Sequence, residues 1–294
     1  MRIRFTGAIV ALAGAAVVTL AVLPIAGQAP QGGRGAGLPP QPAAPAAPAA
    51  RGAAPARVAR IAGHPNMNGI WQAMGSAYWN LEDHSASATQ FWQLGAIGAI
   101  PAGQSVIVEP AGGTIPYTPA ALKKRDELRA GWPKSDPEAK CYMPGIPRAT
   151  YMPYPFQIVQ GQKDILFVYE YASSNRIVHM QSKSEAPVDS WMGWSNGRWE
   201  GETLAITVNG FNDSTWFDRS GNHHTESLTV EERFTPQGDN VLIYEATMTD
   251  PKTFTRPWKI RMPLYRRLEP NVQLLEFKCV EFSEELLYGD LKKK

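Results

Sequence analysis

The stretch GETLAITVNGFNDSTWFDRSGNHHTESLTVEERF, residues 201–234, holds two segments of alternating polarity on either side of a polar loop. Apolar side chains take every second position, as Leu204, Ile206 and Val208 in residues 203–209 and as Leu228, Val230 and Phe234 in residues 227–234. Side chains of a β-strand point alternately to its two faces, so a period of two predicts a pair of half-buried strands. The stretch therefore predicts a β fold with a loop rich in acids and histidines at one end of it.

Similar strand signals recur along the chain with short connections between them. The expected strands cover residues 70–74, 104–110, 156–160, 164–171, 176–181, 191–194, 198–200, 203–209, 227–234, 240–249, 258–268 and 274–282. Asn196-Gly197 is the strongest hairpin signal and predicts a tight turn between two of them. About ten antiparallel strands with no strand–helix–strand alternation predict an all-β fold, either a barrel or a sandwich.

One segment has a good helix signal. Thr118 can cap a helix that starts at Pro119, and Gly131 can end it. Because the apolar face of residues 119–130 is thin, we expect a single peripheral helix.

The first sixty residues differ from the rest of the chain. Residues 1–29 combine Arg2 and Arg4 with an apolar run of small residues, which predicts a signal peptide or an N-terminal anchor. Residues 30–60 are rich in Pro, Ala and Gly and predict a disordered tether. Residues 61–294 are expected to form one β-rich domain that is exported to the periplasm or the extracellular space. The membrane would be a partner only through an uncleaved anchor.

Charge and motifs exclude several classes of function. Residues 1–60 hold six arginines and no acid, so the remaining residues carry 23 basic and 27 acidic side chains. A mildly acidic domain argues against nucleic acid as a partner. The chain has no phosphate-binding or dinucleotide-binding motif, and we expect no cofactor.

The only two cysteines are Cys141 and Cys279. A single pair in an exported domain is more often bridged than free, and we expect a disulfide. The alternative is two buried thiols that never meet. Neither cysteine has a close Cys or His neighbour in the sequence, so no metal site is expected there.

Gly69 and Trp71 in the sequence NGIW resemble the Gly-x-Trp of the first strand of lipocalin-like (calycin) barrels. The resemblance implies that Trp71 closes the barrel floor against a late basic side chain, for which Arg261, Arg266 and Arg267 are candidates. It also implies a pocket for a small, mostly apolar ligand. Residues 80–155 are longer and richer in proline than a simple member of that family would have. Otherwise the chain resembles exported bacterial proteins of unassigned role.

His224 and Glu226 form the sharpest candidate for chemistry. Both share the parity of the apolar positions of their strand, so we expect them to face inward at its mouth, with Asp213 in the loop above and His223 turned outward. A carboxylate beside an imidazole raises the pKa of the imidazole and orients its tautomer, which suits acid–base catalysis of the hydratase or isomerase type. The alternative is a buried pair that satisfies itself structurally. A further alternative is a metal site of His224 and Glu226 with Asp213 or Asp218, although their spacing fits no known compact ligand pattern.

Five further residues are candidates for ligand binding, because loops at a barrel mouth often carry function and aromatic side chains can line a pocket. They are Trp216, Asp218, Trp194, Trp199 and Tyr169. Three functions follow from the sequence: binding of a small apolar or aromatic molecule, acid–base catalysis on such a molecule, and protein interaction at the cell envelope. The alternatives to ligand binding are Asx turns in the loop and tryptophans packed in the core.

Overall fold

A computed structural model describes residues 59–181 and 183–292. The predicted signal or anchor segment and nearly all of the predicted tether lie outside the described residues. Arg60, which the sequence placed in the tether, already belongs to β1 (Arg60–Ile61), which pairs with β2 (His64–Pro65), and its guanidinium binds Glu202. No helix among the described residues is long and apolar enough to cross a membrane.

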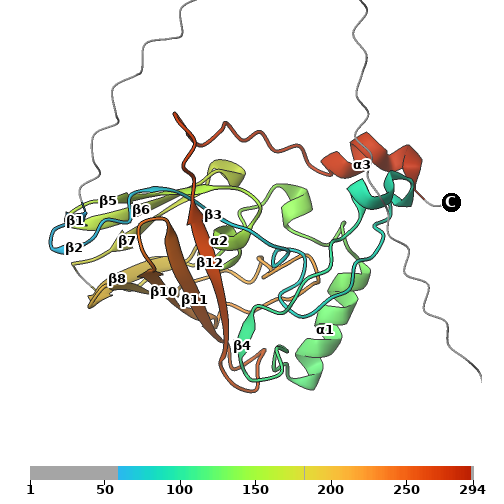
Figure 1. Ribbon diagram of the computed structural model, residues 1–294. Helices are drawn as coiled ribbons and strands as arrows, with labels where there is room; N and C mark the ends of the chain where they lie inside the picture. The colour runs from blue at the N-terminus through green and yellow to red at the C-terminus, as the bar shows by residue number, and fades with distance from the viewer. Residues whose placement is uncertain (1–58, 182, 293–294) are drawn as a thin grey trace, which may run out of the picture. The chain divides into compact units, whose positions relative to one another are not determined.

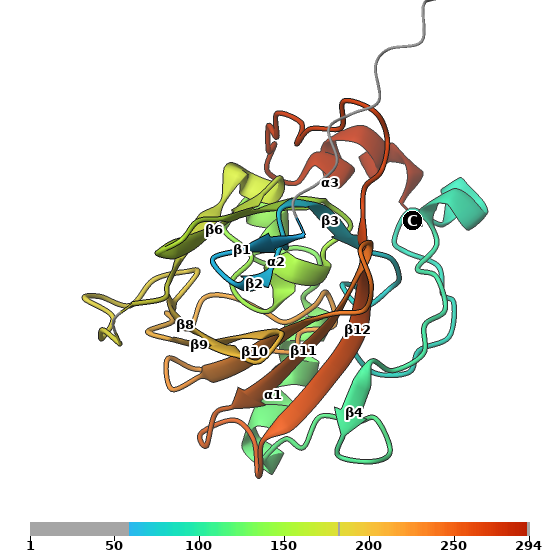
Figure 2. The ribbon, with the colours of Figure 1, turned by 60° about the vertical axis from the view of Figure 1, so that its left-hand side comes forward.

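Nine strands form a closed barrel (Figures 1 and 2). In the order in which they pair around the ring they are β11 (Val241–Thr249), β10 (Thr229–Pro236), β9 (Thr203–Asn209), β8 (Trp194–Glu200), β7 (Asn175–His179), β6 (Asp164–Tyr169), β5 (Phe156–Gln160), β3 (Gly69–Ala73) and β12 (Trp258–Arg266). Pairing between β11 and β12 closes the ring, and the short strand β4 (Ile107–Glu109) pairs with the first residues of β12, on the edge that β3 takes at the other end of β12. The all-β prediction is confirmed, with a barrel in place of a sandwich.

The prediction that every pairing is antiparallel is only partly right, because β7 and β8 run parallel. The predicted turn at Asn196-Gly197 is also wrong, since both residues lie inside β8 and pair with β9. The chain turns instead at Gly201, whose φ of +60° suits a glycine. Gly197 is needed for packing: a Cβ there would lie 2.4 Å from Met180 Sδ and 2.5 Å from Val178 Cγ1.

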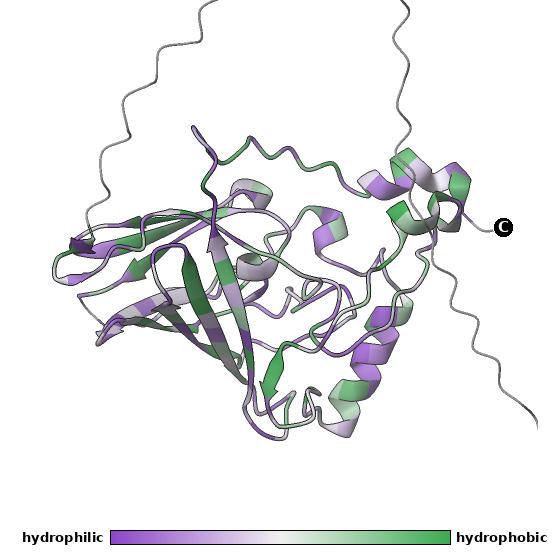
Figure 3. Ribbon diagram, in the orientation of Figure 1, coloured by the Kyte–Doolittle hydropathy of each residue, from purple (hydrophilic) through white to green (hydrophobic). Residues whose placement is uncertain are grey.

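Helix α1 (Pro119–Ala130) starts and ends as the sequence predicts, with the Thr118 hydroxyl accepting a hydrogen bond from Ala121 N. Only Ala121 is buried, and Figure 3 shows α1 as mostly hydrophilic, which confirms a peripheral helix. The sequence missed the shorter helices, which are α2 (Arg148–Tyr151), α3 (Ser283–Tyr288), and the 3-10 turns η1 (Trp92–Gly98), η2 (Glu138–Lys140), η3 (Tyr171–Ser173) and η4 (Gly289–Leu291).

The last predicted strand, residues 274–282, is not a strand. Residues 267–282 form an extended segment, here called the strap, that runs from the end of β12 to α3 (Figure 1). Its side chains are mostly exposed, so the alternation in the sequence reflects only a few contacts. The most important of these is Phe277, whose ring packs on Tyr154 and Tyr171 with centroids 5.3 and 4.9 Å away.

Large side chains fill the interior of the barrel. The most voluminous of those that are almost fully buried are Trp71, Trp258, Tyr169, Tyr244, Phe156, Phe167 and Phe234. A buried ion pair lies among them, with Arg176 Nη1 2.6 Å from Glu232 Oε2 and the Tyr244 hydroxyl donating to Glu232 over 2.8 Å. Such a pair contributes little net stability but leaves a costly unpaired charge when one partner is removed. The barrel is a packed core, and the candidate sites must be sought around it.

The Gly-x-Trp contact has the form that the resemblance implies. Arg266, one of the three candidates, lies over the Trp71 ring with its guanidinium carbon 4.1 Å from the ring centroid, and Arg266 also donates to the carbonyl of Asn68. The indole nitrogen of Trp71 donates to Met67 O over 2.9 Å. Nine strands with one parallel pair nevertheless differ from the eight-stranded up-and-down barrel of lipocalins.

Candidate functional site

The loop between β9 and β10 folds inward and packs against the barrel instead of standing open above it. The backbones of Trp216 and His223 pair as an isolated antiparallel β-bridge, and Phe217 N donates to Asn222 O over 2.7 Å. The turn between them ends at Gly221, where a Cβ would lie 2.7 Å from Arg125 O and 2.8 Å from Arg129 N of α1. Helix α1 therefore covers the tip of the loop.

His224 is fully buried between two threonines. Its Nε2 lies 2.6 Å from the Thr215 hydroxyl and its Nδ1 lies 2.9 Å from the carbonyl of Thr225. Because that carbonyl can only accept, Nδ1 carries the proton and Nε2 accepts from Thr215. Burial lowers the pKa of His224, so the ring stays neutral.

The structure does not bring His224 and Glu226 together. The Glu226 side chain is 49% exposed and forms an ion pair with Lys252 on the surface. The expected inward direction of Glu226 is wrong because β10 begins only at Thr229, and the alternation of a strand does not extend back to residue 226. Asp213 is exposed in the loop, so the three expected catalytic groups do not share a site.

His223 was expected to face solvent and is instead 3% exposed. Its ring stacks on Tyr117 with centroids 5.9 Å apart, and its Nδ1 has no hydrogen-bond partner among the described residues. Burial lowers the pKa of His223 to about 4. The two histidines are thus neutral packing residues of the folded loop.

Asp218 is buried, and its carboxylate accepts hydrogen bonds from three donors. It accepts from Leu81 N (2.9 Å), from Ser220 N (2.9 Å) and from the Asn222 amide (2.6 Å). Burial nonetheless raises its pKa to about 6, against the effect of these hydrogen bonds. Asp218 therefore ties the loop to the segment that follows β3, which is a structural role.

The other expected ligand contacts lie apart from one another. Trp216 is buried in the loop, and Tyr169 is buried in the barrel interior. Trp194 stacks on His179, and Trp199 stacks on His64, each with ring centroids 4.4 Å apart. None of the residues expected to bind a ligand lines either of the two pockets described below.

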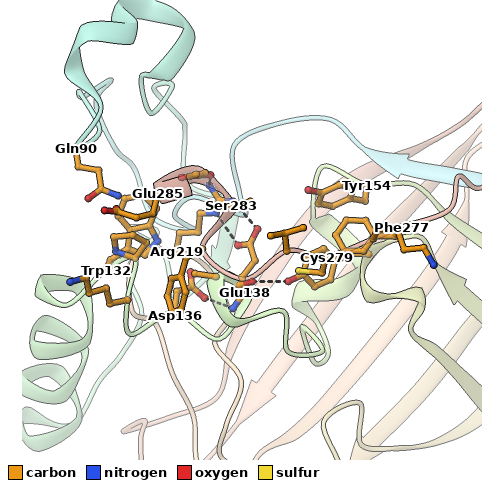
Figure 4. Close-up of a pocket in the computed structure, with 18 residues that line it drawn as sticks. Gln90, Trp132, Asp136, Glu138, Tyr154, Arg219, Phe277, Cys279, Ser283 and Glu285 are labelled. Atoms are coloured by element: carbon orange, nitrogen blue, oxygen red, sulfur yellow. Dashed lines mark hydrogen bonds and ion pairs between the residues drawn. The ribbon is translucent and has the colours of Figure 1, made fainter. Parts of the chain in front are cut away.

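The larger pocket has a volume of about 650 Å³ and lies outside the barrel, under the strap (Figure 4). Most of its lining comes from residues 132–139, from the end of the strap with the start of α3, and from the loop residue Arg219. Gln90, Tyr154 and Tyr171 complete the lining. Most of its exposed wall is apolar, from residues that include Trp132, Pro133, Tyr154, Tyr171, Phe277, Val280 and Phe282. Charged side chains also line it, namely Lys134, Asp136, Glu138, Arg219, Lys278, Glu284 and Glu285. An apolar concave pocket with a few polar groups is the usual form of a small-molecule site.

Four charged side chains form a network in the pocket wall, where Asp136, Glu138 and Arg219 line the pocket and Arg148 lies behind them. Arg219 donates to both carboxylate oxygens of Glu138 over 2.9 and 2.7 Å, and Arg148 donates to Glu138 over 2.6 Å and to Asp136 over 3.1 and 3.2 Å. Burial by itself would raise the pKa of Glu138, but the two arginines outweigh it and lower the pKa to about 2. Glu138 therefore remains ionised and does not act as a general acid.

Stacking fixes the direction of Arg219. Its guanidinium carbon lies 4.4 Å from the ring centroid of Trp79 and 5.5 Å from that of Tyr78. With Glu138 on one side and these rings on the other, the guanidinium is held rigidly at the pocket wall. The sequence could have indicated this contact only through the adjacency of Tyr78 and Trp79.

The expected disulfide is present and holds the strap in place. Cys141 and Cys279 are bonded, with their Cα atoms 5.7 Å apart. Phe282 N also donates to Ala139 O over 2.8 Å, next to the bond. These links position one whole wall of the pocket, so the site depends on the disulfide.

One polar group in the pocket wall lacks a partner. Gln90 Nε2 is buried and donates to none of the described residues, so it can donate to a ligand. Within the described ranges, no three His, Cys, Asp or Glu side chains lie close enough to hold a metal ion.

No family model, curated protein or solved structure matches the chain.

Proposed function

We propose that this protein binds a small aromatic or mostly apolar molecule that carries a hydrogen-bond acceptor, in the pocket under the strap. The observation that supports the proposal most is the combination of aromatic walls, a volume of about 650 Å³ and the unpartnered amide donor of Gln90. Ring faces supply apolar contact area for a flat ligand. The amide selects for an acceptor, because a buried donor without a partner costs free energy.

The charged network in the pocket wall supports binding over catalysis. Glu138 and Arg219 bind each other, which leaves neither free to exchange a proton with a ligand. Their role in the proposal is to hold the pocket wall rigid, since a preformed site loses less entropy when the ligand binds.

Two further observations bear on where the protein works and on its kinship. The Cys141–Cys279 bond supports the proposal of an exported protein, because disulfides persist in oxidising compartments. The closed barrel and the stacking of Arg266 on Trp71 support a distant kinship with lipocalin-like proteins. In this proposal the ligand lies outside the barrel rather than inside it.

Titration with 1-anilinonaphthalene-8-sulfonate, an aromatic dye with acceptor oxygens, tests the proposal. We expect saturable binding to one site, with about tenfold weaker affinity in each of Tyr154→Ala and Gln90→Leu, because a lost ring contact or donor costs about 1–1.5 kcal/mol. Tyr265→Ala is the matched control, since Tyr265 is an exposed ring on β12 outside the pocket. Equal affinity in all four proteins would refute the assignment of the pocket.

A further inference from the structure

A second pocket, of about 550 Å³, lies between the segment that follows β3 and residues 101–106. Its lining is mostly apolar, with Ala73, Met74, Ala77, Pro101, Ala102, Val106 and Met262. Ser76 is the one serine or threonine in the lining. Its Oγ makes no hydrogen bond to the described residues. Ser76 therefore offers an unengaged hydroxyl to a small apolar pocket.

His84 lies beside Ser76, and its tautomer is fixed. Its Nδ1 is 2.9 Å from the carbonyl oxygen of Glu82, which can only accept a hydrogen bond. In the neutral ring, Nδ1 therefore carries the proton and Nε2 carries the lone pair. That Nε2 is buried and has no hydrogen-bond partner among the described residues.

Gly103 shows how close the two side chains are. His84 and Gly103 exchange two backbone hydrogen bonds of 2.9 Å, which hold their Cα atoms opposite each other. A Cβ on Gly103 would lie 2.1 Å from Ser76 Oγ and 2.9 Å from His84 Nε2. The two atoms are therefore at most 5.0 Å apart, the sum of these distances. Rotation of the serine about χ1 moves Oγ between staggered positions and can shorten that distance.

We propose that Ser76 and His84 act as nucleophile and general base in the hydrolysis of small esters with an apolar acyl group. A hydroxyl with a neighbouring oriented imidazole is the arrangement that activates serine, and catalytic hydrogen bonds are often long before substrate binds. The backbone carbonyl of Glu82 orients the imidazole, in the position that a carboxylate has in a catalytic triad. The apolar lining would hold the acyl group.

The reaction balances without any further group. Ser76 Oγ attacks the ester carbonyl carbon while its proton passes to His84 Nε2. The bond to the alkoxy group then breaks, and that group leaves as an alcohol with the proton from Nε2. Water attacks the acyl-serine with Nε2 as its base, which releases the acid and restores the hydroxyl.

Labelling of the full chain with a fluorophosphonate, followed by peptide mass spectrometry, tests the proposal. We expect covalent labelling of Ser76 and measurable turnover of p-nitrophenyl acetate. Ser76→Ala should lose the label at that position, and His84→Gln should slow it by about 100-fold, the usual lower range for a general base. Ser85→Ala, at an exposed serine one residue from His84, should react like the wild type. Absence of the label at Ser76, or equal rates in wild type and His84→Gln, would overturn the proposal.

Gly103→Ala provides a second test that leaves both reactive side chains in place. The added methyl group would lie between Ser76 Oγ and His84 Nε2 and would force them apart. Gly103 does not have a positive φ, so the backbone can accept alanine. We expect a loss of labelling similar to that in His84→Gln with an unchanged circular dichroism spectrum. Wild-type labelling in a folded Gly103→Ala protein would count against the pair.

Discussion

Single residues in the loop between β9 and β10 show how burial decides the role of an ionisable group. His223 and His224 have the composition of a reaction centre, but burial lowers the pKa of both rings and keeps them neutral. Asp218 experiences the same burial with the opposite effect on its pKa, which rises to about 6. In both cases the uncharged form is favoured, as desolvation requires.

The pH dependence of stability should follow from these shifts. An unfolded chain protonates its histidine near pH 6.5, whereas folded His223 does so near pH 4, so His223 removes stability as the pH falls from 6.5 to 4. Asp218 partly offsets this loss, because the folded state binds its proton first, from about pH 6 downward. We expect His223→Phe to reduce the loss of unfolding free energy between pH 7 and pH 4.5 by about 1–3 kcal/mol in urea titrations.

Asp218→Asn is the opposing control for that experiment. The carboxyl group of Asp218 binds its proton more tightly in the folded state than in the unfolded state, so it adds stability as the pH falls. Without it, the unfolding free energy should fall more steeply with decreasing pH. A pH profile that is the same in wild type and His223→Phe would show that His223 is not buried as described.

At the scale of the elements, glycine positions distinguish the real turn from the expected one. Gly197 lies within β8 under Met180 and Val178, with too little room for a Cβ. Gly201 lies in the turn between β8 and β9 with a φ of +60° and no atom within 4 Å of a Cβ. The Asn-Gly signal therefore arises from close packing across the parallel β7–β8 pair.

Two substitutions should separate these roles. Gly197→Ala forces a methyl group into a packed site and should lower the unfolding free energy by about 1–3 kcal/mol. Gly201→Asn should be nearly neutral, because asparagine tolerates a positive φ and has open space there. Urea unfolding of both variants measures the difference. A larger loss in Gly201→Asn than in Gly197→Ala would contradict the register of β8.

In the described part of the chain as a whole, a filled barrel carries a site on its periphery. The barrel strands bury the large side chains of the core, while the pocket under the strap is closed mainly by the Cys141–Cys279 bond and the packing of Phe277. Stability and ligand binding should therefore depend on different residues.

Replacing both Cys141 and Cys279 by serine tests this separation. The bond closes a loop with a sequence separation of 138 residues, and its loss should cost about 2–4 kcal/mol, mainly through the unfolded chain. Hydrogen exchange should become faster in residues 277–285 and stay slow in β9, β10 and β11, and dye binding should be lost. Equal acceleration in the barrel strands would show that barrel and strap are one cooperative unit.

Features that depend on local pattern could be predicted from the amino-acid sequence. Alternating residues predict β9 and most of β10 correctly, and the Thr118–Pro119 signal predicts the start of α1. The single cysteine pair predicted the disulfide, because there was only one way to join the two residues. These features need no knowledge of which distant segments meet.

The closure of the ring and the positions of the pockets follow from packing between segments that are distant in the sequence. The pairing of β11 with β12, the parallel β7–β8 contact and the inward folding of the loop that holds His223 depend on long-range packing. Glu226 was predicted to face inward because it shares the even positions of the apolar residues of β10. An alternating pattern does not show at which residue the strand begins, and β10 begins after Glu226. The contact of Arg219 with its pocket and the contact of Ser76 with His84 both join segments that are distant in the sequence. The free energy of packing brings these segments together, and local propensity does not. Their spacing in the sequence therefore carries no periodic signal that could predict the contacts.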